Sequence, residues 1–265
     1  MAAYAIGFFV PFVMGLYLSF CEFTTLSDAV FTGFDNYVRA FSDAGEFVHA
    51  LWFTALFAAL STAAVNVLGL AAALVLTRGH RGTNALRTAL FLPNLIGGIV
   101  LGWLWQVLLN GLLARRGLTL VSSEWYGFWG LMAVTVWQQL GYMMIIYIAG
   151  LVSIPGDALE AAAIDGANAV QSFWHVKLPM LRPSITICTF LTLTNGFKLF
   201  DQNLALTNGM PSNRSQLLAL NIYHTFYGRT GWAGAGQAKA VVFCLIVVGI
   251  ALLQLRLTRA GEVQQ

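Results

Sequence analysis

Residues 51–76 read LWFTALFAALSTAAVNVLGLAAALVL and contain no charged side chain. A helix needs about 20 mostly apolar residues to cross the hydrocarbon core of a bilayer, and this run is longer than that. Its apolar residues do not alternate with polar ones, as they do in the strands of a membrane barrel. The stretch therefore predicts a transmembrane helix.

Five further stretches have the length and apolar character of a membrane span. Together with the first they lie at 2–20, 51–76, 88–109, 127–152, 185–206 and 238–257. The stretch at 185–206 is the weakest of the six, because polar and charged residues interrupt it. No domain-sized segment separates the spans. We therefore expect an all-α, polytopic integral membrane protein of about six transmembrane helices, forming a single transmembrane domain over residues 1–265.

The composition agrees with a chain that faces lipid. Of its 265 residues, 58% are hydrophobic and only 9% are charged, against about 25% charged in ordinary globular proteins. This excludes a disordered chain, a soluble nucleic-acid binder and a soluble disulfide scaffold. The three cysteines lie in or beside apolar runs, and the four histidines are scattered. The sequence therefore predicts no metal site and no nucleic-acid partner.

Lysine and arginine in the loops indicate the orientation. With both termini in the cytosol, the inner loops hold Arg78, Arg81, Arg87, Lys177, Arg182, Arg256 and Arg259. The outer loops then hold Arg39, Arg115, Arg116, Arg214 and Arg229. The excess inside predicts cytosolic N- and C-termini. Because the chain starts directly at an apolar stretch, we also expect a short cytosolic tail to precede it.

Two connections are long enough to have a role of their own, an inner one at about 153–183 and an outer one at about 203–236. The inner one predicts a helical hairpin: Asp157 is expected to cap the first helix, Gly166 breaks it, and Pro179 closes a second helix. Ala161 and Ala162 leave the first helix without bulk, which suits close docking into another protein. The alternative is that this hairpin packs on its own helix bundle.

The same residues carry a resemblance. The segment Glu160-Ala161-Ala162, then Gly166, and then Val176, Leu178 and Pro179 resembles the "EAA" loop of bacterial ABC-importer permeases, with Val176 in place of the usual Ile. Further stretches are similar to the maltose and multiple-sugar branch of that family: Gly33-Phe34-Asp35-Asn36-Tyr37, Phe91-Leu92-Pro93-Asn94, Trp103 to Trp105, Phe200-Asp201 and Leu206 to Pro211. The resemblance covers nearly the whole chain.

The resemblance implies a type I ABC importer permease fold in the bacterial cytoplasmic (inner) membrane. It implies that two related permeases form a path for a sugar, which an extracytoplasmic binding protein delivers and two cytosolic ATPases drive. The residues expected to couple to the ATPases are Glu160, Ala161, Ala162, Asp165, Gly166, Leu178 and Pro179. The sequence lacks GxxxxGK[ST], so we expect no ATPase site and no cofactor in this chain; ATP and Mg²⁺ would be bound by the partner ATPase.

Polar side chains within the spans mark the expected sugar path, because they are costly in lipid unless they face a cavity or a partner. The candidates are Gln139, Tyr142, Asn195, Lys198 and Gln202, with Gln106 and Asn110 in reserve. Their amides, hydroxyl and ring suit sugar hydroxyl and C–H groups. Hydrogen bonding between helices is the alternative for each of them, and Asp201 could pair with Lys198. For the whole chain the alternative is a secondary transporter or channel.

Overall fold

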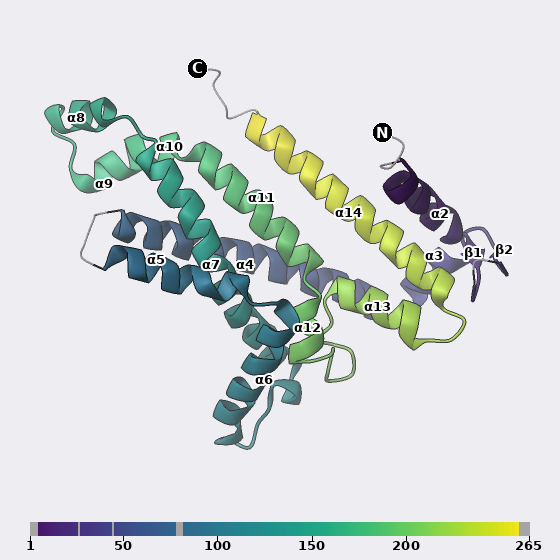
Figure 1. Cartoon of the computed structure of the whole chain (residues 1–265). Coiled ribbons are helices and arrows are strands. Elements are labelled where there is room, and N and C mark those ends of the chain that lie inside the picture. The colour runs from purple at the N-terminus through teal and green to yellow at the C-terminus, as the bar shows by residue number, and fades with distance from the viewer. Residues whose placement is uncertain (1–4, 26, 44, 78–81, 260–265) are drawn as a thin grey trace.

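A computed structural model describes residues 5–25, 27–43, 45–77 and 82–259, and these are mainly helical (Figure 1). The elements before the first long connection are η1 (Ala5–Phe9), α2 (Val10–Leu18), β1 (Cys21–Glu22), β2 (Val30–Phe31), α3 (Asp35–Ser42) and α4 (Glu46–Leu76). The middle of the chain forms α5 (Thr83–Phe91), η2 (Leu92–Leu95), α6 (Gly98–Ala114), η3 (Leu120–Ser122) and α7 (Glu124–Val152). The remainder forms α8 (Gly156–Ile164), α9 (Ala169–Ser172), η4 (Phe173–Lys177), α10 (Leu178–Met180), α11 (Arg182–Lys198), α12 (Asp201–Leu206), α13 (Leu218–Gly228) and α14 (Ala233–Arg259).

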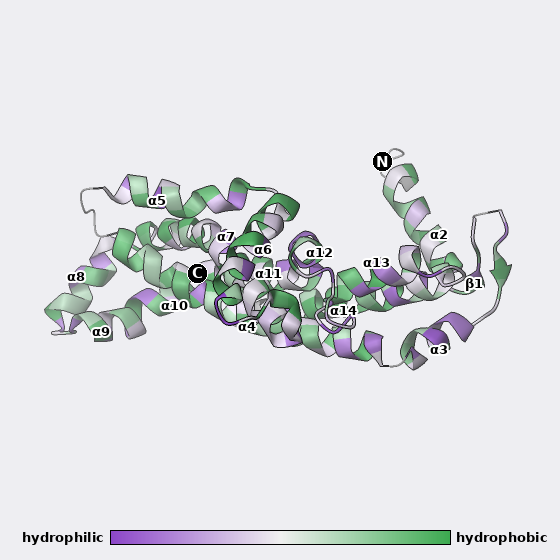
Figure 2. Cartoon of the chain, turned by 90° about the horizontal axis from the view of Figure 1, so that it is seen from below, coloured by the Kyte–Doolittle hydropathy of each residue, from purple (hydrophilic) through white to green (hydrophobic). Residues whose placement is uncertain are grey.

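Three of the six expected spans form helices long and apolar enough to cross a membrane: α4, α7 and α14. Hydrophobic residues run along much of these helices, whereas hydrophilic ones gather on α3 (Figure 2). The expected span at 2–20 is a short apolar helix in the described residues, and its first residues lie outside them. Arg78 and Arg81, used above for the orientation, also lie outside the described residues.

The helices α4, α7 and α11 form the centre of the bundle. Tyr147 of α7 donates its hydroxyl hydrogen bond to Asn66 of α4, and Asn66 donates to Thr192 of α11 over 3.0 Å. Around this chain pack the buried side chains Val65, Met143, Met144 and Cys188. Because each polar group has a partner inside the bundle, the three helices can pack closely at a depth where water is scarce.

The expected span at 88–109 is wrong as one continuous helix. The chain leaves α5 through the short 3₁₀ helix η2 and re-enters α6 at an angle of 103°. Pro93 cannot donate a helical hydrogen bond, and Gly97 takes an extended conformation, so the ladder stops here. The two parts form either a broken span or a re-entrant loop.

The expected span at 185–206 also breaks. It ends at Lys198, Leu199 is extended, and the chain turns into the short helix α12. α12 lies across α6, and a Cβ atom placed on Gly102 would come 2.8 Å from that of Ala205. A side chain at position 102 would therefore push the two helices apart, so this crossing depends on glycine.

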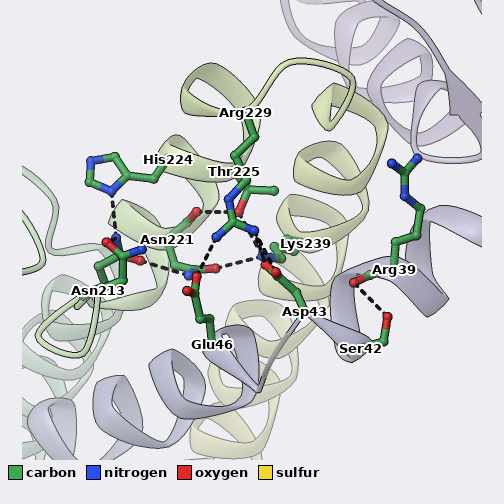
Figure 3. A network of polar contacts seen from close by, with 11 residues as sticks. Arg39, Ser42, Asp43, Glu46, Asn213, Asn221, His224, Thr225, Arg229 and Lys239 are labelled. Carbon is green, nitrogen blue, oxygen red and sulfur yellow. Dashed lines mark hydrogen bonds and ion pairs between the residues drawn. The ribbon is translucent and has the colours of Figure 1, made fainter.

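A charged cluster holds the start of α4, the end of α13 and the first turns of α14 together (Figure 3). Asp43, just before α4, accepts two hydrogen bonds from Arg229 at 2.7 and 2.8 Å, and one from Lys239 at 3.1 Å. Glu46 accepts from Arg229 at 2.8 Å. The ammonium of Lys239 is fully buried, and it also donates to Asn221 and Thr225. All three donors of this buried cation are thus used, as burial of a charge requires.

Asp43→Asn should destabilise the chain by about 3 kcal/mol, because it leaves the buried ammonium of Lys239 without its counter-charge. Thermal unfolding of the protein in detergent measures the loss. The exposed Asp35→Asn on α3 removes the same charge and serves as the control. Equal losses in the two variants would contradict a special role of the cluster.

The same cluster predicts a dependence on pH. Burial raises the pKa of Asp43, but the hydrogen bonds from Arg229 and Lys239 outweigh it, so the pKa lies below its ordinary value of 3.8. A carboxyl whose folded pKa is depressed stabilises the fold above its unfolded pKa. This contribution should be present above about pH 4 and be lost as the pH falls through the folded pKa.

Candidate functional site

A polar pocket of about 330 Å³ opens where the two helix breaks meet α7. Its lining residues come from η2, from the middle of α7, and from the end of α11 with the start of α12. They are Asn94, Gln138, Gln139, Asn195, Lys198, Leu199, Phe200, Asp201 and Gln202. Segments far apart in the sequence thus bring amide and charged side chains to one place, in a chain otherwise dominated by apolar residues.

Gln138 of α7 fastens both breaks. Its Nε2 donates to the carbonyl of Ile96, which the helix break leaves without a helical partner, over 3.1 Å. Its Oε1 accepts from Gln202 of α12 over 2.6 Å. One buried amide therefore joins the bend between α5 and α6 to the turn between α11 and α12. The pocket exists because these two irregular segments are held against the same helix.

The side chain of Gln139, next to Gln138, makes no hydrogen bond with a described residue. Its Oε1 is buried without a hydrogen-bond partner, and no hydrogen bond between described residues involves this amide. A buried polar atom of this kind costs about 1–3 kcal/mol unless something satisfies it. Gln139 lines the polar pocket, but its Oε1 is covered by other protein atoms and does not face the open space.

Lys198 and Asp201 both line the pocket and are exposed. The pairing considered from the sequence does not form, since the ion pairs between described residues include neither of them. Asn195 lies one turn before Lys198 on α11 and is exposed as well. The pocket therefore offers a cation, a carboxylate and a free amide to an occupant.

Four of the five residues expected on the sugar path line this pocket: Gln139, Asn195, Lys198 and Gln202. Tyr142 lies on α7 and is exposed, but it does not line the pocket. The reserve pair holds the protein together instead: Gln106 donates to the carbonyl of Leu206, and Asn110 accepts from the amide of Leu120. Neither residue lines the pocket, and each binds a backbone group of another element.

Five lining residues were not among the sugar-path candidates: Asn94, Gln138, Leu199, Phe200 and Asp201. Asn94 and Phe200 belong to stretches quoted for the resemblance, and Gln138 neighbours the candidate Gln139. The sequence does offer one indication that Asn94 has a role, since this polar residue follows Pro93 directly in an apolar run. The break that places it at the pocket depends on contacts with α7, which the sequence does not display.

The inner hairpin forms at one end of the bundle, opposite α3 and α13 (Figure 1). Glu160, Ala161 and Ala162 lie on α8, Asp165 and Gly166 form the turn after it, and Leu178 and Pro179 belong to α10. Gly166 has a φ of 79°, a conformation that other residues resist, so the break expected here is confirmed.

Two details of the hairpin differ from expectation. Asp157 does not cap α8, because the helix begins earlier and Pro155 occupies the N-cap position without a side-chain hydrogen bond. The capping box belongs to the second helix, where Asn168 and Gln171 satisfy each other's backbone. Pro179 does not close that helix, because helical residues continue to Met180. The π-turn η4 before it widens the helix and makes room for the proline ring.

The hairpin presents an uncovered surface. Glu160 is exposed and has no ion-pair partner among the described residues. On the same hairpin, Ile164 is 86% exposed and Trp174 is 59% exposed. Large apolar side chains in water around an unpaired carboxylate are typical of a surface that another protein covers.

The candidate metal and catalytic chemistry is sparse. Within residues 5–25, 27–43, 45–77 and 82–259, no three histidine, cysteine or acidic side chains gather as metal ligands. Cys21 and Cys188 are buried, Cys244 is partly buried, and none of them is paired.

Comparison with known proteins identifies several relatives. Residues 65–260 match the family described as "Binding-protein-dependent transport system inner membrane component". The chain is 43% identical to the "Probable starch degradation products transport system permease protein AmyD" of Thermoanaerobacterium thermosulfurigenes, over 96% of this chain and 89% of that protein. It is 31% identical to the "Multiple sugar-binding transport system permease protein MsmF" of Streptococcus mutans, over 97% and 91%.

The fold also has solved counterparts. A chain in the crystal structure of a bacterial ABC transporter involved in the import of the acidic polysaccharide alginate superposes with a TM-score of 0.81, at 20% identity. The match covers 97% of this chain and 91% of that one. The architecture is therefore a type I ABC importer permease fold.

Gln138→Leu should loosen both helix breaks, because it leaves the carbonyl of Ile96 and the amide of Gln202 unpaired. Each stranded group costs about 1–3 kcal/mol, and thermal unfolding in lipid nanodiscs measures the sum. Gln139→Leu is the matched control, since it is the same change one residue on and breaks no hydrogen bond. If Gln139→Leu destabilises the protein as much as Gln138→Leu does, Gln138 has no special role in holding the two breaks against α7.

Proposed function

The chain belongs to the family of binding-protein-dependent transport system inner membrane components, and we propose that it is the membrane-spanning subunit of an ATP-driven carbohydrate importer. One observation carries this proposal: five amide side chains line the polar pocket at the helix breaks, and that of Asn195 is exposed and makes no hydrogen bond with a described residue. A neutral, hydroxyl-rich solute satisfies such groups without leaving a charge buried. The names of the relatives AmyD and MsmF, which refer to starch products and multiple sugars, support a carbohydrate.

The partners follow from the same assignment. The path is completed by a second, related permease, an extracytoplasmic binding protein delivers the sugar, and two cytosolic ATPases bind ATP and Mg²⁺. The chain performs no chemistry itself. We place it in the bacterial inner membrane with both termini in the cytosol, which puts the α8–α10 hairpin on the side of the ATPases.

The hairpin couples the chain to the ATPases. Glu160 pairs with a basic residue in a groove of the ATPase, and Ala161 and Ala162 allow the helix to approach closely. Asp165 and Gly166 set the turn, and Leu178 and Pro179 carry the movement into α11. The exposure of Glu160, Ile164 and Trp174 supports this role, and it favours an ATP-driven importer over a stand-alone secondary transporter.

Asn195→Leu should reduce import by about five- to tenfold for sugars whose hydroxyl groups bind this amide, with less effect on others. Uptake of several sugars, normalised to membrane-inserted protein, measures the selectivity. Asn110→Leu is the control, because that amide holds the backbone of Leu120; it should lower the amount of folded protein and affect all sugars alike. An equal loss for every sugar in the Asn195 variant would remove Asn195 from the path.

Glu160→Lys should abolish transport and release the ATPase from the solubilised complex, while the binding protein still captures sugar. Asp157→Lys makes the same charge change one turn earlier on α8 and should retain most of the activity. Uptake and co-purification of the ATPase measure the two variants. If Glu160→Lys transports normally with the ATPase attached, the hairpin is only structural.

A further inference from the structure

A second pocket, of about 360 Å³, lies beyond the end of α11, between α13 and the start of α14. Four of its nine lining residues are aromatic, namely Phe200, Tyr223, Phe226 and Tyr227, and Gln237 of α14 is among the others. None of its lining residues is charged. The pocket therefore suits a neutral ligand and not an ion.

The rings of this pocket brace one another. The centroid of Tyr223 lies 5.2 Å from that of Phe200 and 5.1 Å from that of Tyr227, and Tyr227 lies 4.8 Å from Phe226. These spacings fall within the range of favourable aromatic pairs. The ring positions are thus fixed by packing before any ligand arrives.

The two tyrosines nevertheless remain open. Tyr227 is 72% exposed and Tyr223 is 41% exposed. No hydrogen bond between described residues uses either phenolic hydroxyl, whereas the buried Tyr147 hydroxyl is paired. Braced rings with free hydroxyls offer two kinds of contact to a sugar: the negative face of the ring attracts C–H groups, and the hydroxyl binds polar groups.

Phe200 connects this pocket to the polar one. It lines both, and it stands directly after Leu199, where α11 ends. A linear ligand seated among Gln139, Asn195 and Lys198 would therefore have Phe200 beside it, and the tyrosines beyond. Both volumes lie near the lower end of the range of small-molecule sites, about 300–1,000 Å³.

We propose that the Phe200–Tyr223–Tyr227 pocket is a second carbohydrate subsite, which stacks a further ring of an oligosaccharide whose first ring occupies the polar pocket. The inference rests on the proposed function and extends it: it assigns the substrate class as an oligosaccharide. Because the contact is stacking, it depends on the aromatic rings more than on their hydroxyls.

Tyr223→Ala and Tyr227→Ala test the subsite, with Tyr223→Phe and Tyr227→Phe as controls that keep the ring. Import by the reconstituted complex is measured for the mono-, di- and tetrasaccharide of a sugar series that the wild type transports. The alanine variants should lose about two- to tenfold on the tetrasaccharide and little on the shortest sugar. The phenylalanine variants should stay close to wild type on all of them.

The outcomes separate the two proposals. A wild-type complex that imports no carbohydrate contradicts the proposed function itself. A wild type that imports sugars, with alanine variants that lose nothing or lose equally at every chain length, contradicts only the subsite. An equal loss would assign the rings to packing or to contact with the second permease.

A labelling experiment tests the proposal even if the alanine variants insert poorly into the membrane. Tyr227→Cys, in a chain whose partly buried Cys244 is replaced by alanine, exposes one reactive thiol in the pocket, because Cys21 and Cys188 are buried. The tetrasaccharide, delivered by its binding protein, should slow reaction of this thiol with a water-soluble maleimide several-fold, and the monosaccharide should not. Identical rates with and without the tetrasaccharide overturn the proposal.

Discussion

Every backbone polar group at membrane depth must find its partner inside the protein, and the form of this chain depends on that constraint. The straight helices α4 and α7 satisfy it with their own ladders. The breaks after Phe91 and Lys198 do not, because each leaves carbonyl or amide groups outside a helix. Gln138 resolves part of this deficit at the first break, where it donates to the carbonyl of Ile96, and it joins the second break through the side chain of Gln202, whose Nε2 donates to it. The irregular segments can therefore exist only where they meet α7.

The pocket follows from this meeting. A continuous helix would bury its side chains against its neighbours or expose them to lipid, whereas a broken helix turns side chains such as Asn195 and Lys198 toward a shared space. Not every polar side chain in the spans serves that space. Gln106 and Asn110 spend their hydrogen bonds on backbone groups of other elements, and Gln139 does not. The amides of Gln106 and Asn110 are thus occupied away from the pocket, whereas Asn195 lines it and is exposed.

The two ends of the bundle are built in opposite ways. At the end near α3 and α13 the charges are paired with each other, and the buried Lys239 uses all its donors on Asp43, Asn221 and Thr225. At the hairpin end Glu160 is unpaired and Ile164 and Trp174 face outward. A paired cluster holds helices in place, and an unpaired surface is left for a partner. Phe200 lines both the polar pocket and the pocket that Tyr223 and Tyr227 of α13 line.

Much of this protein could be predicted from its sequence. Long uncharged runs such as 51–76 and 127–152 determine that the chain is a helical membrane protein, because lipid leaves few other ways to satisfy a backbone. The local sequence also predicts the turn at Gly166, because glycine adopts a positive φ more readily than residues that carry a Cβ atom. The breaks within 88–109 and 185–206 could not be predicted from the sequence, although Pro93 is a residue that interrupts helices. A break at membrane depth is tolerated only where a residue distant in the sequence, such as Gln138, binds a group that the break leaves unpaired. The N-cap of α8 at Pro155 was missed because Asp157 and Glu160 have the spacing of a capping box, whereas the helix begins at Gly156, before Asp157. Composition and the spacing of apolar residues are local properties of the chain, so they can be taken from the sequence. Gln138 and Ile96 are 42 residues apart, and the pairing of such distant polar groups is decided only when the helices pack.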